Sequence, residues 1–401
     1  MATHPTSQAR PEIREFASGD DLEALWDLAR RAFGPWTSDS AQQRAERLAE
    51  AESAVREHRV FGAFDGRRVI ASARYHDMRQ WWHGRSAPMA GVAAVMVAPE
   101  YRGHGVGRAL MTALLDAIAA RGYPLSVLYP ATMPIYRSLG WELAGGMHQA
   151  VIPARSLRSL APTDVTGETP GISLRAAELR RAAPSDADQV LSAVGRAHEL
   201  ARDCGPITRD AETVARWLTD PDLYAYIADD GFLAYRWHGG NEEISVERAV
   251  AASAETARAT WSIIASHSSI AETVRARLGP ADPFWWLTRE RDADLTGRDM
   301  WMLRIVDAPA AIAARGFPVS VELSARLWID DKARAGNSGL WELSVAGGKG
   351  RLVPCQEADA PLVLGARGLA ALYAGTPVGA LRLAGLAAGG TPEADGALDG
   401  A

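Results

Sequence analysis

The chain has 401 residues and a net charge of −6, with 43 basic and 49 acidic side chains, a balance that argues against a nucleic-acid-binding protein. Only two cysteines, Cys204 and Cys355, occur, and the histidines lack metal-binding spacing, so neither a disulfide framework nor a metal site is expected. No uncharged apolar run reaches ~18 residues, so we expect a soluble cytoplasmic protein without a membrane span.

The first third of the chain predicts a mixed α and β domain. Apolar residues recur at helical spacing over residues 20–33, with Ser18 and Asp20 as candidate caps, and again over residues 106–121. Strands are predicted at residues 59–64, 69–75, 91–97 and 125–129, with a hairpin turn at Asp65-Gly66 between the first two.

A second α/β segment is predicted after a polar, proline-containing linker at residues 156–171. Its expected helices are residues 185–202 and 255–265, and its expected strands are residues 223–228, 232–237, 243–251 and 283–288. The order of elements repeats that of the first third, which suggests a diverged duplication. Ser253 and Thr256 are typical of a helix N-cap without a glycine loop, so no second ligand site is expected there.

The last hundred residues predict antiparallel strands. These are residues 300–305, 318–327, 340–345 and an edge strand at 352–354, followed by a short helix at 366–373. The apolar face of this region could hold a lipid, although an ordinary core is the simpler interpretation. Residues 387–401 are rich in glycine and alanine, and their composition alone predicts a disordered tail.

The most informative segment joins the strand at residues 91–97 to the helix at 106–121. Arg102-x-x-Gly105-x-Gly107 places residues without side chains where backbone amides face a ligand. The helix N-terminus adds unpaired N–H groups and a partial positive charge. The segment therefore predicts a cradle for a pyrophosphate.

Several interpretations of this loop compete. A glycine-rich connection without a ligand is the simplest. A dinucleotide-binding fold would need G-x-G-x-x-G and an acidic residue on the next strand, and an NTPase loop would need Gly-Lys-Ser/Thr, and both patterns are absent. The segment resembles the [QR]-x-x-G-x-[GA] loop of the GNAT superfamily of N-acetyltransferases at every specified position.

A second motif agrees with this resemblance. Tyr136-x-x-x-Gly140-Trp141 resembles the Y-x-x-x-G-[FW] end of the same acetyltransferase domain. A tyrosine hydroxyl can protonate a departing thiolate as a general acid. The alternative is a half-buried core tyrosine whose hydroxyl bonds to the backbone. Together with the upstream loop, the pattern favours the acid.

The whole chain resembles the Eis (enhanced intracellular survival) family of N-acetyltransferases. The resemblance implies an α/β (α+β) protein with two tandem GNAT-like domains followed by a sterol-carrier-protein-like α/β domain. We place the catalytic domain at residues 1–155, a diverged domain without a CoA loop at 156–297, and the third domain at 298–401, with a tail that reaches the active site. The family also implies a homohexamer.

The same resemblance implies acetyl-CoA as the acetyl donor, Tyr136 as general acid and the terminal carboxylate of Ala401 as general base. The acceptor is expected to be a primary amine of a small polyamine, an aminoglycoside-like molecule or a lysine, beside Phe33 and Trp36. The residues expected to contact CoA are Val95, Met96, Val97, Arg102, Gly103, His104, Gly105, Val106, Gly107, Arg108, Ala131 and Thr132. The alternative from another class is a non-catalytic scaffold that binds acyl-CoA or lipid.

Overall fold

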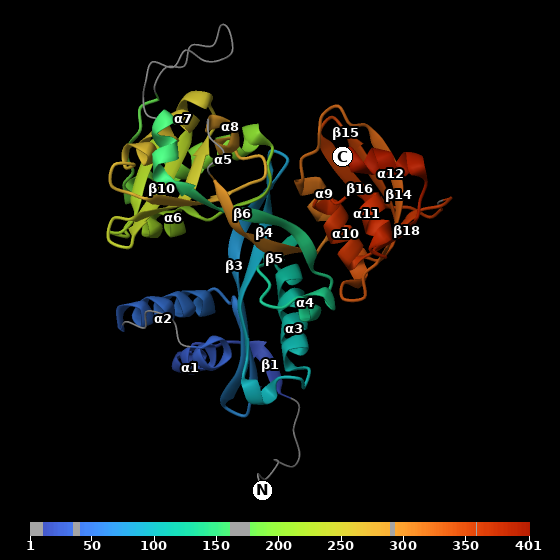
Figure 1. Cartoon of the computed structure of the whole chain (residues 1–401). Helices are drawn as coiled ribbons and strands as arrows, with labels where there is room; N and C mark the ends of the chain where they lie inside the picture. Colours follow the sequence, from blue (N-terminus) through green and yellow to red (C-terminus); the bar gives the residue numbers. More distant parts are fainter. Residues whose placement is uncertain (1–10, 35–40, 161–176, 289–292, 358) are drawn as a thin grey trace. The chain divides into compact units, whose positions relative to one another are not determined.

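The computed structural model describes residues 11–34, 41–160, 177–288, 293–357 and 359–401. These residues form two compact units (Figure 1). The first unit comprises Met1–Met78, Ala87–Ala144 and Met302–Ala401, and the second comprises Arg79–Ser86 and Gly145–Trp301. Among the described residues, no helix has both the length and the apolar character needed to cross a membrane.

The N-terminal domain of the first unit is built on a sheet with the strand order β1-β2-β3-β4-β5-β13. Its strands are β1 (Glu12–Glu15), β2 (Val60–Asp65), β3 (Arg68–Trp82), β4 (Arg85–Val97), β5 (Leu125–Leu128) and β13 (Asp294–Ile305). Strands β4 and β5 are parallel, but their ladder pairs only residues 89–91 with 125–127. The end of β4, residues 92–97, therefore leaves the edge of β5, and this is where the site forms.

Helices cover both faces of this sheet (Figure 1). They are α1 (Leu22–Phe33), α2 (Ala41–Arg56), α3 (Val106–Ala120), α4 (Pro134–Arg137) and the 3₁₀ turn η1 (Pro99–Tyr101). Leu110 of α3 and Ile70 of β3 belong to one apolar cluster, whereas Leu28 of α1 and Val69, the residue before Ile70, belong to another. Because neighbouring strand residues point to opposite faces, α3 and α1 lie on opposite sides of the sheet.

The structure of this domain differs from the sequence-based prediction at the cap of α1 and at helix α2. The cap of α1 is Asp21, whose carboxylate accepts from the Ala24 amide at 3.2 Å. Asp20 instead accepts from Arg14 at 2.6 Å and from the Ala17 amide at 2.7 Å, because a carboxylate one residue earlier reaches the preceding turn. Helix α2 was not expected, because its sequence has only a weak apolar stripe and few of its described residues are buried.

The second unit repeats this plan with the strand order β6-β12-β11-β10-β9-β7. Its strands are β6 (Glu142–Pro153), β7 (Arg180–Arg181), β8 (Cys204–Thr208), β9 (Tyr224–Ala228), β10 (Gly231–His238), β11 (Glu243–Ala251) and β12 (Thr273–Leu278). Its helices are α5 (Ala187–Ala201), α6 (Ala211–Trp217), α7 (Ala254–Ser266) and α8 (Phe284–Leu287), with 3₁₀ turns η2 (Ala154–Leu160) and η3 (Pro184–Asp186). Strands β11 and β12 are parallel, as β4 and β5 are.

The prediction of a strand at residues 283–288 is wrong, because this segment contains the helix α8. The Asp282 carboxylate accepts from the Phe284 amide at 3.0 Å and starts the turn, and the Phe284 ring packs 4.4 Å from Trp261. This aromatic burial overrides the strand preference of the sequence. The expected linker also begins too early, since Leu157 and Leu160 of η2 are buried, while residues 161–176 lie outside the described part.

The C-terminal domain has a five-stranded sheet with the order β16-β15-β14-β17-β18. Its elements are α9 (Ala308–Ala314), β14 (Leu323–Asp330), η4 (Ala335–Asn337), β15 (Gly339–Ala346), β16 (Lys349–Pro354), β17 (Leu362–Gly365), α10 (Ala366–Tyr373), α11 (Val378–Leu383), β18 (Ala387–Gly389) and α12 (Pro392–Asp399). The predicted edge strand is confirmed as β16. Residues 300–305 do not join this sheet, because β13 pairs with β5. The strand expected from residue 318 begins at Leu323, after a turn in which the Pro318 carbonyl accepts from the Val321 amide.

The tail that composition predicts to be disordered is ordered. Strand β18 pairs with β17, and Thr391 caps α12 by accepting from the Ala394 amide at 3.3 Å. Asp399 accepts from the Val378 amide at 2.7 Å, and Leu398 is buried. Backbone pairing, a cap and one apolar contact thus order a sequence of low complexity.

Candidate active site

The end of β4 carries an unusual backbone at Ala94, whose φ is +51°. A non-glycine residue in this left-handed region costs roughly 1–3 kcal/mol, so the surrounding structure must impose it. The distortion lies where β4 leaves β5. Met96 is then buried, and Val95 and Val97 pack at the edge of the domain core. The backbone groups of residues 92–97 therefore turn away from the β4–β5 ladder.

Arg102 holds the loop after β4 in place. Its Nε donates to the Val97 carbonyl at 3.2 Å, and its Nη2 donates to the Ala32 carbonyl at 3.1 Å. His104 Nδ1 lies 2.8 Å from the Arg102 carbonyl. The arginine of the predicted motif thus fixes the loop against β4 and the end of α1 through its side chain.

The glycines of the loop leave the N-terminus of α3 open. Gly103 and Gly105 both have φ of +79°, and a Cβ at either position would meet no atom within 4 Å. Gly105 is the N-cap of α3 and offers no side chain to its first amides. Unpaired amides and the helix dipole favour an anion, so the residues present fit a pyrophosphate group.

Gly107 brings three elements of the site together. A Cβ at this position would lie 3.2 Å from Val97 Cγ2 of β4 and 3.2 Å from Ile135 Cδ1 of α4. Val106 beside it is buried, and Arg108 Nη2 lies 3.4 Å from the Ser138 carbonyl, just past α4. The anion cradle at α3 and the helix that carries Tyr136 are therefore neighbours.

Tyr136 is buried in the core, with 6% of its surface exposed. Its ring lies edge-on to Trp141, with centroids 6.5 Å apart, and burial raises the pKa of its phenol. Burial is the one cause of this shift, and no hydrogen bond to the phenol contributes to it.

The remaining expected residues are more dispersed. Ala131 and Thr132 are exposed in the loop between β5 and α4. Phe33 is exposed at the end of α1, and Trp36 lies outside the described residues. The carbonyl oxygen of Ala401 accepts from Arg315 Nη2 at 3.3 Å, so the described contact of this residue is within the C-terminal domain.

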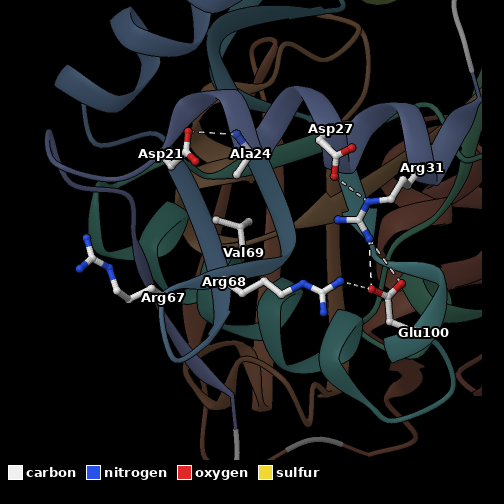
Figure 2. Close-up of a pocket in the computed structure, with 8 residues that line it drawn as sticks. All are labelled: Asp21, Ala24, Asp27, Arg31, Arg67, Arg68, Val69 and Glu100. Atoms are coloured by element: carbon white, nitrogen blue, oxygen red, sulfur yellow. Dashed lines mark hydrogen bonds and ion pairs between the residues drawn. The ribbon is translucent and has the colours of Figure 1, made fainter. Parts of the chain in front are cut away.

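A charged groove of about 480 Å³ that sequence reasoning missed lies between α1, β3 and η1 (Figure 2). Its centre is an ion-pair chain in which Arg31 binds Asp27 at 2.7 Å and Glu100 at 3.2 Å. Arg68 also binds Glu100. The pKa of Glu100 is lowered by a hydrogen bond from its own backbone amide. The positive charges of Arg31 and Arg68 lower it further. The groove adjoins the loop because Glu100 precedes Arg102 by two residues.

Three domain models match the chain in the expected order. Two describe an acetyltransferase (GNAT) domain, at residues 12–144 and 205–305, and the third a sterol carrier protein domain, at residues 308–399. A GCN5-related N-acetyltransferase from Kribbella flavida is 42% identical, with a TM-score of 0.90 and coverage of 98% of this chain and 96% of that chain. The chain is a GCN5-related N-acetyltransferase.

Other relatives agree with this assignment. The N-acetyltransferase Eis of Mycobacterium tuberculosis is 29% identical over 374 residues, which cover 89% of this chain and 88% of the relative. A GCN5-related N-acetyltransferase from Anabaena variabilis is 26% identical, with a TM-score of 0.80 and coverage of 98% and 97%. The predicted fold of two GNAT domains and a sterol-carrier-like domain is confirmed, and the chain is an enzyme rather than a scaffold.

The boundaries expected at residues 155 and 297 stay predictions, and residue 297 falls inside β13. The second GNAT domain of this acetyltransferase lacks the open helix start. Ser253 is the N-cap of α7, and its Oγ accepts from the Thr256 amide at 3.2 Å, which confirms the predicted cap. Asp230 accepts from the hydroxyl of Thr256. Side chains thus occupy the position that glycines leave open in the first domain.

Proposed function

We propose that this acetyltransferase moves the acetyl group of acetyl-CoA to a primary amine, with Tyr136 as general acid. The observation that carries the proposal is the packing of Gly107 between Val97 and Ile135. It joins an open helix N-terminus, suited to a pyrophosphate, to a buried tyrosine. Residues 103–108 would hold the pyrophosphate through backbone N–H groups, and Ala131 and Thr132 would border the rest of the donor.

Each remaining residue then has a chemical role. Backbone N–H groups of residues 95–97 can polarise the thioester carbonyl. The amine nitrogen bonds to the carbonyl carbon, the carbon–sulfur bond breaks, and the Tyr136 hydroxyl gives its proton to the sulfur. Burial raises the pKa of this phenol, so the proton is present at neutral pH. The side chain of Arg102 keeps the loop in position.

The base in this proposal is the carboxylate of Ala401, acting on the amine directly or through water. This role follows from the family resemblance, and it requires the tail to exchange its contact with Arg315 for one with the substrate. Appending a few residues after Ala401 should lower turnover sharply without unfolding the protein, whereas an N-terminal tag should not. Equal turnover of both tagged forms would place the base elsewhere.

The acceptor in this proposal is a small polyamine, an aminoglycoside-like amine or a lysine side chain, bound beside Phe33 and Trp36. Steady-state turnover of acetyl-CoA with each of these amines tests the function. The Tyr136→Phe variant is the control, because it removes the proposed general acid. Turnover with free amines would show that the enzyme does not need a docked protein as its substrate. No turnover with any free amine or lysine peptide would contradict the proposal. The proposed homohexamer is checked by native mass measurement.

A further inference from the structure

Gly140 closes the turn that follows α4, and it lies against the C-terminal domain. Its φ is +92°, which favours glycine. A Cβ at this position would lie 2.7 Å from Ala366 Cβ at the start of α10 and 2.9 Å from Arg304 Cζ. Real side chains do not approach so closely. In this protein, the glycine of the Tyr136-x-x-x-Gly140 motif therefore makes room for the C-terminal domain.

The carboxylate of Glu142 joins α4 to the same helix α10. Its Oε1 accepts from Arg137 Nη2 at 2.7 Å and Nε at 3.0 Å, and its Oε2 accepts from Arg367 Nε at 2.6 Å. The Glu142 side chain is only 5% exposed. A buried carboxylate with two guanidinium partners is a fixed point between the two domains, because its oxygens are bonded from both sides.

Glu142 is ionised in this environment. Burial by itself would raise the pKa of its carboxyl, but hydrogen bonds from Arg137, the Leu143 amide and Arg367 outweigh burial and lower it. The Leu143 amide donates at 2.9 Å. Both charge-assisted contacts therefore persist at neutral pH.

Tyr136 is connected to Glu142 through the chain on either side. Arg137 directly follows Tyr136 in α4. The Tyr136 carbonyl accepts from the Trp141 amide at 3.1 Å, and Trp141 directly precedes Glu142 and packs against the Tyr136 ring. A displacement of Glu142 would move the short helix α4, which has only four residues. The hydroxyl of Tyr136 would move with it.

We propose that Glu142 is a positioning residue for Tyr136, and that Arg367 of the C-terminal domain completes the arrangement by bonding Glu142 from the opposite side. The inference rests on the proposed function, because it affects catalysis only if Tyr136 is the general acid. It gives the sterol-carrier-like domain a role in the acetyl transfer step. Proton transfer tolerates little displacement between donor and acceptor, so loosening this contact slows the step. The pyrophosphate loop is still held by Arg102, which donates to the Val97 and Ala32 carbonyls rather than to Glu142.

Arg367→Met tests the proposal in the full chain. Arg367 is 37% exposed, so its replacement should leave the fold intact. We expect kcat to fall about tenfold while the KM for acetyl-CoA stays within about twofold, and Arg367→Lys to recover part of the loss. The matched control is Arg326→Met, which removes a 2.9 Å ion pair with Glu342 between similarly exposed side chains of the same domain. It should leave kcat unchanged.

The Tyr136→Phe background separates positioning from a general structural effect. If Arg367 acts through Tyr136, Arg367→Met should not lower kcat further in Tyr136→Phe. An equal loss in both backgrounds, or an unchanged kcat in the single variant while Tyr136→Phe remains impaired, would overturn the positioning role alone. An unchanged kcat in Tyr136→Phe would overturn the proposed acid together with this inference.

Discussion

The two GNAT domains share a scaffold but differ in the residues that start one helix. In the first domain, parallel strands β4 and β5 flank the glycine loop that leads into α3. In the second, parallel strands β11 and β12 flank a loop that leads into α7. The first helix begins with an uncapped Gly105, and the second with Ser253, whose hydroxyl oxygen accepts from a first-turn amide.

This difference shows that the scaffold alone does not make an anion site. The loop of the second domain is filled as well as capped, because Thr256 is 1% exposed and binds the carboxylate of Asp230. A phosphate there would lose an amide donor and meet a negative charge. In the proposed assignment, a few residues at the helix start therefore decide whether the same arrangement of strands offers a site for the CoA pyrophosphate.

The largest effect is expected from closing the open loop. Gly105→Glu should abolish the thermal stabilisation that acetyl-CoA gives to the wild type, because the carboxylate would fill the cradle and repel the pyrophosphate. The strain at φ +79° adds to this effect. Thermal shift with and without acetyl-CoA measures it, with Ser253→Ala as the control that keeps the shift. A wild-type shift in Gly105→Glu would remove the pyrophosphate assignment.

Tyr136→Phe is expected to affect the chemical step of the first domain. The variant should lower kcat by roughly 10²–10⁴-fold, the usual contribution of a general acid, and leave acetyl-CoA affinity near the wild-type value. Steady-state kinetics with a small amine and titration calorimetry measure the two quantities. If kcat hardly changes, another group or water protonates the thiolate.

The pH dependence of kcat provides a milder test of the same residue. Burial raises the pKa of the Tyr136 phenol above its ordinary value near 10. Only the protonated phenol can act as the acid. Deprotonation of Tyr136 should therefore begin to lower kcat only above about pH 10. A loss of kcat near pH 8 that disappears in Tyr136→Phe would contradict a protonated phenol held by burial.

The smallest effect is expected in the second domain. Ser253→Ala should lower the free energy of unfolding by about 1 kcal/mol, because it removes the N-cap of α7. It should not create a second CoA site, since Thr256 and Asp230 still fill the loop. Denaturant unfolding measures the first effect, and calorimetry should give one acetyl-CoA per chain before and after the change. Two sites in the wild type would refute the difference between the domains.

Much of the first site could be predicted because its signals are local. Gly105 and Gly107 identify the loop, Tyr136 lies at a fixed distance from Gly140, and the helix expected at residues 366–373 has the bounds of α10. The functional assignment gained most from the family resemblance. Nothing in the sequence indicated the left-handed backbone at Ala94, because alanine ordinarily avoids it.

Elements whose partners are distant in sequence were harder to predict. Residues 300–305 read as a strand, but only the structure shows that β13 pairs with β5 rather than with the C-terminal strands. Strand β12 has an alternating sequence and was missed, although that alternation is a readable signal. The order of the tail depends on the Val378 amide and on β17. Composition cannot report such partners.

The sequence by itself determined which residue types stand at the loop and at position 136, and from these it predicted the chemistry of the site. Glycine backbone freedom, a helix start and a tyrosine are properties of residues close together in the chain. Only the tertiary structure decided that Gly107 joins Val97 to Ile135, and that Glu142 meets Arg367 from a domain more than two hundred residues away. The physical reason is that side-chain contacts across such distances depend on how whole elements pack, which local preference does not encode.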